Sequence, residues 1–281
     1  MMKVALPNKG GLFEPTIELL ASCGYKVARA GATLASLDPE NGVEFYFLRP
    51  GDIPLYVANG MLDAGITGKD FVAEKGLSTP VLLDLHYGHS RLCAAVPAGS
   101  PVQTLDEVAG LRIATSFPVI TSTFFAGRTL SLVELEGAVE ISVRLGIAEA
   151  VIDLVETGTT LKEAGLRVVG EPLFRSNAAL FAHAENGSAP PELMTMQRRI
   201  EGKLVALEYM MVEYDVPAAI LAAASAITPG IESPTVTPLQ AEGWYSVKAM
   251  IRKREAHRIM DELSELGCKG ILLTTIESAR I

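Results

Sequence analysis

An apolar segment of the chain ends in two acidic residues and a threonine-rich turn. The sequence at 150–161 reads Ala-Val-Ile-Asp-Leu-Val-Glu-Thr-Gly-Thr-Thr-Leu, and its acids are Asp153 and Glu156. Gly158 allows the backbone to approach a ligand closely, and successive N–H groups at a helix start favour an anion. Carboxylates just upstream suit sugar hydroxyls or a metal-bound diphosphate. The stretch therefore fits a phosphorylated ribose, although such a turn is also typical of a capped helix start with no ligand.

The elements that must position this turn alternate along the first two thirds of the chain. Short apolar runs predict strands at 3–6, 44–48, 63–67, 81–85, 92–96, 112–115, 132–135, 150–155, 167–169 and 178–182. Amphipathic runs between them predict helices at 14–23, 52–59, 105–109, 122–130, 139–145 and 160–164. This alternation predicts parallel α/β layers, with one sheet ending and a second beginning near Ser90.

The last part of the chain has a different order. A turn-rich break at 184–191 and a long predicted helix at 192–207 precede it. The pattern is then β-α-β-β-α-β, with strands expected at 208–213, 236–239, 244–251 and 270–276 and helices at 217–227 and 255–266. This order is typical of a small ferredoxin-like domain, in which we expect Asp215 to cap the first helix.

Composition and charge exclude several classes of function. The chain has 24 Lys and Arg against 33 Asp and Glu, a net charge of −9, which argues against a general nucleic-acid or anionic-membrane binder. Its three cysteines, Cys23, Cys93 and Cys268, lie far apart and predict a reducing compartment. With no signal peptide and no apolar run of about 20 residues, we expect a cytoplasmic protein.

Common catalytic and metal motifs are missing from the sequence. It has no G-x-S-x-G, no G-x-G-x-x-G and no Walker loop, so any ATP must be bound by other means. The histidines of the run at 86–89, His-Tyr-Gly-His, have no partner at metal-ligand spacing, and a solvated turn is the favoured interpretation.

The wider context of the turn resembles the signature of the ATP phosphoribosyltransferase family, the first enzyme of histidine biosynthesis. The matching positions are Glu140, Gly146, Ala148, Val151, Asp153-Leu154-Val155, Thr157-Gly158 and Thr160-Leu161. Segments that look like other loops of the family are Pro7-Asn8-Lys9-Gly10 and the stretches at 47–53, 65–70 and 112–118. Ile231-Glu232-Ser233-Pro234-Thr235 is similar to a segment of the long, self-regulated form.

This resemblance implies an α/β fold with two periplasmic-binding-protein-like lobes around a cleft, followed by an ACT-like regulatory domain. Lobe I would span 1–90, completed by about 178–205, and lobe II would span 91–177. The regulatory domain would span 206–281. The resemblance also implies a homo-oligomer, a dimer or a hexamer, with no nucleic-acid or membrane partner.

The implied reaction transfers a phosphoribosyl group from phosphoribosyl pyrophosphate to N1 of ATP, releasing pyrophosphate and forming phosphoribosyl-ATP. Mg²⁺ is the expected cofactor and would arrive on the substrate diphosphate, so no residue is assigned as a metal ligand. The protein has only to position two reactants and neutralise the leaving group. A sequence with no evident nucleophile fits that task.

The resemblance also implies roles for individual residues. Those expected around phosphoribosyl pyrophosphate are Asp153 for the ribose hydroxyls, Glu156 as a further candidate, and Thr157, Gly158, Thr159 and Thr160 for the 5-phosphate. Those expected to clamp phosphates or contact the other substrate are Lys9, Arg49 and Asp70. From the residues alone, the two basic side chains read equally well as solvated surface charges.

A second ligand, histidine, is implied for the regulatory domain as a feedback inhibitor. The residues expected to bind it are Asp215, Ser233, Thr235 and Gly270. A helix cap and a tight turn explain the same residues without a ligand.

Two other functions share this layout. A prephenate dehydratase joins a bilobed catalytic region to an amino-acid-sensing domain, but its Thr-Arg-Phe triplet is replaced here by Ser176-Asn177-Ala178. A solute-binding receptor has the same lobes, but it would need an export signal and no sensor domain.

Overall fold

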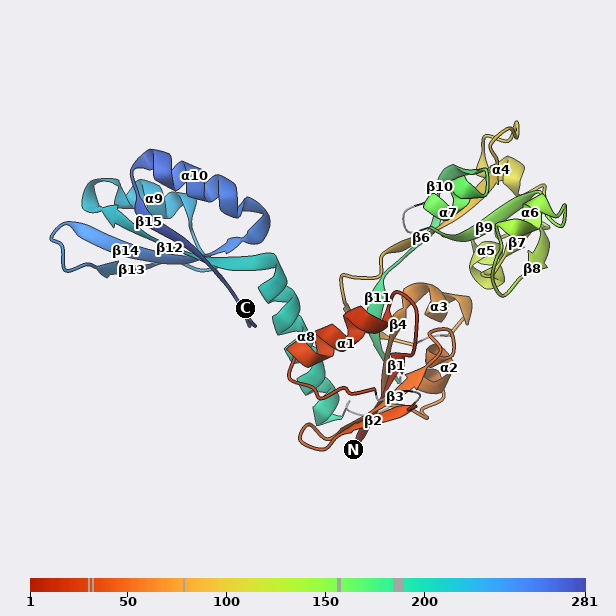
Figure 1. Ribbon diagram of the computed structural model, residues 1–281, viewed down its shortest axis with the longest axis horizontal. Helices are drawn as coiled ribbons and strands as arrows, with labels where there is room; N and C mark the ends of the chain where they lie inside the picture. The colour runs from red at the N-terminus through yellow and green to blue at the C-terminus, as the bar shows by residue number, and fades with distance from the viewer. Residues whose placement is uncertain (30, 32, 78, 156–157, 184–189) are drawn as a thin grey trace. The chain divides into compact units, whose positions relative to one another are not determined.

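The computed structural model describes residues 1–29, 31, 33–77, 79–155, 158–183 and 190–281 (Figure 1). The chain divides into two units, residues 1–193 and 194–281. The first unit holds a six-stranded and a five-stranded sheet, and the second holds a four-stranded sheet. None of the helices within the described ranges is long and apolar enough to cross a bilayer.

The six-stranded sheet has the strand order β2-β3-β1-β4-β11-β5, and we refer to it and its helices as lobe I. Its strands are β1 (Met2–Pro7), β2 (Ala35–Asp38), β3 (Val43–Leu48), β4 (Ala64–Gly68), β5 (Val81–Asp84) and β11 (Ala178–Ala182). Its helices are α1 (Phe13–Ser22), α2 (Ile53–Ala58) and α3 (Lys69–Glu74). The central strand β1 pairs parallel with β3 and β4, and its Val4, Ala5 and Leu6 are fully buried, because helices cover both faces of such a sheet.

The five-stranded sheet has the order β10-β6-β9-β7-β8, and with its helices it forms lobe II. Its strands are β6 (Ser90–Pro97), β7 (Arg112–Thr115), β8 (Ser131–Glu134), β9 (Ala150–Val155) and β10 (Leu166–Ser176). Its helices are α4 (Leu105–Val108), α5 (Pro118–Phe124), α6 (Ile141–Arg144) and α7 (Thr159–Glu163). Alternate residues of β9 enter two hydrophobic clusters, Ile152 one of them and Val151 the other, so β9 is covered on both faces.

The chain passes between the two sheets twice, and the two passes are hydrogen-bonded to each other. The Leu85 N–H donates to the Ala178 carbonyl at 2.9 Å, and the Ala178 N–H donates to the Tyr87 carbonyl at 2.9 Å. The Asn177 side-chain amide donates to Asp84 Oδ1 at 3.0 Å. Paired crossing segments of this kind hold lobes I and II together. The α/β class predicted from alternating runs is confirmed. The prediction of parallel layers was wrong in part, because both sheets are mixed: β2, β11 and β5 form antiparallel pairs in lobe I, and β6 and β10 do so in lobe II.

The second unit is the predicted ferredoxin-like domain. Helix α8 (Pro191–Glu208) enters it and is followed by β12 (Tyr209–Pro217), a 3₁₀ turn (Ala218–Ile220), α9 (Leu221–Ile227), β13 (Thr235–Pro238), β14 (Trp244–Arg252), a second 3₁₀ turn (Lys253–Glu255), α10 (Ala256–Leu266) and β15 (Lys269–Thr275). The antiparallel sheet has the order β13-β14-β12-β15, and α9 and α10 lie on one of its faces (Figure 1). Val212, Tyr214 and Val216 of β12 are buried with these helices, so the alternating Glu213 and Asp215 lie on the open face.

Several local predictions were wrong. Asp215 does not cap a helix, because β12 continues through Pro217 and pairs Asp215 with Ser246. The helix predicted at 122–130 starts earlier, at Pro118, where a proline without an N–H fits the first helical position. Strand β2 and helix α3 were not predicted, since both are too short to show a clear period.

Candidate active site

A pocket of about 430 Å³ lies in the first unit, where the loops that follow several strands meet. Its lining comes from residues 9–12, Pro50, Gly68, Asp70 and Phe71, residues 88–90, and Leu154. The lining residues from 9 to 71 belong to lobe I, and Leu154 belongs to β9 of lobe II. Residues far apart in sequence therefore converge on one hollow.

Asp70 is the buried charged group of this pocket. It lies in the first turn of α3 and is only 3% exposed. The Ser176 hydroxyl donates to its Oδ1 at 2.5 Å and accepts its backbone N–H at 3.0 Å. Burial raises the pKa of the Asp70 carboxyl, while the bonds from Ser176 and from the backbone N–H groups act in the opposite direction. A Cβ on Gly68 would overlap Asp70 Oδ1, so glycine at that position lets the carboxylate turn inward.

The two predicted phosphate clamps occupy different positions. Lys9 is exposed and lines the pocket, in the loop between β1 and α1. Arg49 is exposed too, but it is absent from the lining, to which its neighbour Pro50 contributes. The Arg49 carbonyl accepts the Asp52 N–H at 2.9 Å ahead of α2. Of the two, Lys9 is the one that the fold brings beside Asp70.

His86, Gly88 and His89 are exposed, in agreement with the predicted solvated turn, but the segment at 86–89 also contributes to the pocket. Gly88, His89 and Ser90 line the pocket, and the Tyr87 hydroxyl lies 2.6 Å from Thr16 Oγ1. Burial raises the pKa of Tyr87 to about 12. Sequence reasoning missed these pocket residues because a crossing between two sheets leaves no periodic pattern. A glycine next to polar residues between two apolar runs was the only signal, and it is typical of any loop.

Asp153 lies on β9, beside the pocket but with its side chain on the other face of the sheet from Leu154. Its Oδ1 accepts the Leu154 N–H at 2.8 Å. Burial raises the pKa of the Asp153 carboxyl; the Leu154 N–H lowers it, and the nearby Glu140 carboxylate raises it further. Asp153 is therefore a desolvated carboxylate at the end of the strand that carries the signature.

Helix α7 starts directly after Gly158, three residues beyond the end of β9. Gly158 has φ +81°, a left-handed conformation that glycine adopts without strain, and α7 begins at Thr159. The side chains of Thr159 and Thr160 are exposed at this helix start. Glu156 and Thr157, which the resemblance also assigns to the turn, lie outside the described residues.

The candidate histidine residues fall on two parts of the second sheet. Asp215 Oδ2 lies 3.4 Å from the point where a Cβ on Gly270 would lie, so these two residues are neighbours on β12 and β15. Thr235 begins β13, beyond β14, and the Ser233 hydroxyl donates to the Pro234 carbonyl at 3.2 Å. The structure therefore joins Asp215 with Gly270, and β14 separates that pair from Thr235.

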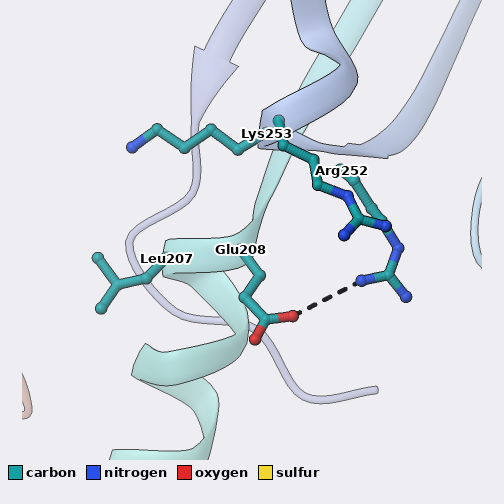
Figure 2. Close-up of a pocket in the computed structure, with 5 residues that line it drawn as sticks. Leu207, Glu208, Arg252 and Lys253 are labelled. Atoms are coloured by element: carbon teal, nitrogen blue, oxygen red, sulfur yellow. Dashed lines mark ion pairs between the residues drawn. The ribbon is translucent and has the colours of Figure 1, made fainter. Parts of the chain in front are cut away.

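A second hollow, of about 550 Å³, lies where α8 meets the sheet of the second unit. Leu207 and Glu208 of α8 line it together with Arg252, Lys253 and Arg254. Arg252 Nη1 lies 3.8 Å from Glu208 Oε2, an ion pair that is drawn as a dashed line in Figure 2. The Arg252 guanidinium also lies 5.3 Å from the Tyr209 ring centre. These contacts join the end of α8 to β14. None of the candidate histidine residues lines this hollow.

Within the described part of the chain, no three His, Cys, Asp or Glu side chains converge to hold a metal ion. Asp153 is the carboxylate at the signature turn that could face a cation carried by a substrate. This donor set fits an ion that is bound mainly by phosphate oxygens and water, as Mg²⁺ often is.

Comparison with known proteins identifies relatives along the whole chain. The family described as ATP phosphoribosyltransferase (HisG) matches residues 49–202, and the HisG C-terminal domain matches residues 206–278. An ATP phosphoribosyltransferase of Bifidobacterium longum (strain DJO10A) is 41% identical over 283 residues and covers 100% of both chains. One from Arthrobacter sp. (strain FB24) is 43% identical over 288 residues, again with 100% of both covered.

Solved structures add the fold. The ATP phosphoribosyl transferase (HisG:HisZ) complex from Thermotoga maritima is 26% identical, with a TM-score of 0.60 over 72% of this chain and 96% of that one. A substrate-binding protein of an amino acid ABC transporter reaches a TM-score of 0.50 at 14% identity, over 73% of this chain and 93% of its own. That second likeness shows the bilobed fold alone.

The full-length relatives favour neither a dehydratase nor a solute receptor. They also span the C-terminal domain that distinguishes the long form. The chain therefore belongs to the ATP phosphoribosyltransferase family in its long form, the enzymes that catalyse the first step of histidine biosynthesis.

Proposed function

We propose that the pocket and the turn after β9 form one site, in which phosphoribosyl pyrophosphate and ATP meet. The observation that carries this proposal is Leu154, which lines the pocket that also holds Lys9 and Asp70. Leu154 belongs to the signature strand, between Asp153 and the turn that precedes α7. The family relationship supplies the chemistry, and this convergence supports its location.

In this proposal the turn binds phosphoribosyl pyrophosphate. The N–H groups at the start of α7 and the hydroxyls of Thr159 and Thr160 hold the 5-phosphate, together with Gly158 and with Glu156 and Thr157 of the same turn. Asp153 accepts hydrogen bonds from the ribose hydroxyls. Lys9 and Arg49 neutralise phosphates of ATP or of the departing pyrophosphate, and Asp70 contacts ATP from the pocket wall.

The chemical step is a displacement at the ribose C1. The lone pair of adenine N1 forms a bond to C1, and the bond from C1 to the pyrophosphate oxygen breaks, so that pyrophosphate leaves with the electron pair. Positive charge develops on the ribose in the transition state, and negative charge develops on the leaving group. A carboxylate at the sugar and cations at the phosphates stabilise both charges. The protein contributes orientation in addition, because both reactants must be held in line.

We propose Mg²⁺ as the cofactor, held by the diphosphate of the substrate with Asp153 as the facing carboxylate. When bound, the ion neutralises charge on the leaving pyrophosphate. The phosphoribosyl-transferring family as a whole supports this assignment.

We further propose that histidine binds the second unit and that the chain works as a homo-oligomer. Asp215 and Gly270 would hold one part of the histidine, while Ser233 and Thr235 lie beyond β14. A dimer or hexamer could provide the two states that feedback requires. The cytoplasmic location remains a prediction from the sequence.

The test is a pyrophosphate-release assay on the purified chain with Mg²⁺. We expect release only when ATP and phosphoribosyl pyrophosphate are both present, together with a product of the mass of phosphoribosyl-ATP. Release that did not require ATP, or turnover of prephenate under the same conditions, would contradict the proposal. Adding histidine in a parallel titration tests the regulatory part separately.

A further inference from the structure

Helix α3 of lobe I ends in a glutamate that binds the start of a helix in lobe II. The two carboxylate oxygens of Glu74 accept the N–H groups of Val119 at 2.9 Å and Ile120 at 3.0 Å. These N–H groups belong to the first turn of α5, whose donors have no partner within the helix. Glu74 therefore supplies, from 45 residues earlier in the sequence, a cap that the segment before α5 does not provide.

Other residues of α3 also contact lobe II. The Phe71 and Phe117 ring centres are 6.3 Å apart, and Ala73 packs against the hydrophobic cluster of lobe II that contains Phe117. At the other end of the helix, Asp70 is hydrogen-bonded to Ser176, the last residue of β10. Lys69 and Val72 of α3 contact lobe I, whereas the other four residues of the helix contact lobe II.

The groups around Glu74 act on the ionisation of its carboxyl in both directions. Burial raises the pKa of the Glu74 carboxyl, and the Val119 and Ile120 N–H groups act against that rise. The charged groups that face it are Lys75, which lowers the pKa, and Glu134, which raises it. Bonds between an ionised carboxylate and helix N–H groups are stronger than bonds between neutral partners.

The place where Glu74 attaches is next to the phosphoribosyl turn. Strand β7, which leads into α5, pairs parallel with β9, and Thr115 is the register partner of Ile152. Because the carboxyl ends of parallel neighbours share one edge of a sheet, α5 starts at the same edge at which β9 ends, two residues after Asp153. Helix α3 meanwhile contributes Asp70 and Phe71 to the pocket. One short helix thus links the pocket wall to the edge of lobe II that carries the signature.

We propose that Glu74 is a positioning residue that fixes α3 against α5 and so holds the two halves of the substrate site at their working separation. This proposal rests on the proposed function, which places one half of the site in each lobe. Glu74 does not line the pocket. It acts by setting where Asp70 and the signature turn stand relative to each other.

The test compares Glu74→Gln and Glu74→Ala with Glu107→Gln. Glu107 is the matched control because it too accepts backbone N–H groups, at Gln103 and Thr104, but within a capping box confined to lobe II. We expect kcat/KM to fall about tenfold in Glu74→Gln, which keeps one acceptor oxygen, and about 100-fold in Glu74→Ala. Glu107→Gln should stay within about twofold of the unmodified chain, since its bonds do not cross between lobes.

A merely structural role would change the unfolding temperature and leave the kinetics of the folded protein unchanged. The deciding readouts are therefore the separate kcat and KM values at a temperature where all variants are folded, and the acidic limb of the pH–rate profile. Protonation of Glu74 should contribute to loss of activity on acidification, and that contribution should be absent in Glu74→Gln. Unchanged kcat and KM in a folded Glu74→Ala would overturn the proposal. Failure of the unmodified chain to transfer phosphoribosyl groups would instead overturn the proposed function.

Discussion

The two units hold their candidate binding carboxylates in different ways. Asp70, in the first unit, is 3% exposed and is hydrogen-bonded to Ser176, 106 residues away in sequence. Asp215, in the second unit, is half-buried on the open face of a sheet, beside Gly270 on the neighbouring strand. The first arrangement desolvates a charge inside a pocket, where electrostatic effects on a reaction are largest. The second leaves the carboxylate accessible to a ligand, as reversible sensing requires.

Breaking the phosphoribosyl end of the first site should have the largest effect. Asp153→Asn removes the carboxylate but keeps the size of the side chain, and we expect kcat/KM to fall about 100-fold or more. Pyrophosphate release measures the change, and Asp106→Asn, at an exposed surface ion pair, is the control. Near-normal turnover in Asp153→Asn would remove this residue from the site.

Asp70→Asn should separate the effect of the buried charge on stability from its effect on turnover. Turnover should fall about tenfold, because the charged contact to substrate that we propose for Asp70 is lost. Stability should not fall at neutral pH. Burial raises the folded-state pKa of Asp70 above its unfolded value, so above that pKa the ionised carboxylate opposes folding, and asparagine removes this opposition.

The stability difference should also depend on pH with a defined sign. As the pH falls through the raised pKa, Asp70 takes up a proton in the folded chain first, and the advantage of Asp70→Asn disappears. Thermal unfolding of both proteins across this pH range checks the prediction. The contributions of the other acidic groups are the same in both proteins and cancel when their stabilities are subtracted. A variant that is clearly less stable than the unmodified chain at neutral pH would show that the ionised carboxylate stabilises the fold.

The smallest effect on turnover is expected in the second unit. Asp215→Ala should leave basal turnover within about twofold but weaken histidine inhibition about tenfold. A tenfold change lies within the usual range of coupling between an effector site and an active site. Glu213→Ala is the matched control, because Glu213 lies on the same face of β12 and is paired with Lys248 at 3.0 Å. Histidine titrations of the three proteins measure the effect, and equal inhibition in all of them would exclude Asp215 from the histidine site.

Prediction from the sequence was most accurate where the residues that form a feature are contiguous in the chain. The apolar run of β9, its acid Asp153 and the following turn are contiguous, so their order along the chain is also their order in space. The ferredoxin-like domain was predicted from the local periods and the order of its elements, although its central strand β12 pairs with β14 and β15, which are not its neighbours in sequence. The same local reading failed at Asp215, which was expected at a helix start and lies in a strand.

Prediction was weakest for α3. The helix has six residues, too few for a hydrophobic period, although it carries both Asp70 and Glu74. The motif suggested that Asp70 contacts a substrate, but nothing near it in sequence indicated Ser176 as its partner. The role of Glu74 depends on α5, which local patterns placed four residues too late. Both partners come from the other sheet or the segments that lead to it.

Local patterns in the sequence determined the α/β class and the β-α-β-β-α-β order of the last part, and the signature motif indicated the family by resemblance, because each depends on residues close together in the chain. Only the tertiary structure decided that Lys9, Asp70, His89 and Leu154 line one pocket and that Glu74 binds α5. It also decided which carboxylates are desolvated. Burial and long-range hydrogen bonds depend on how sheets pack, and side chains brought together by packing leave no regular spacing in the sequence.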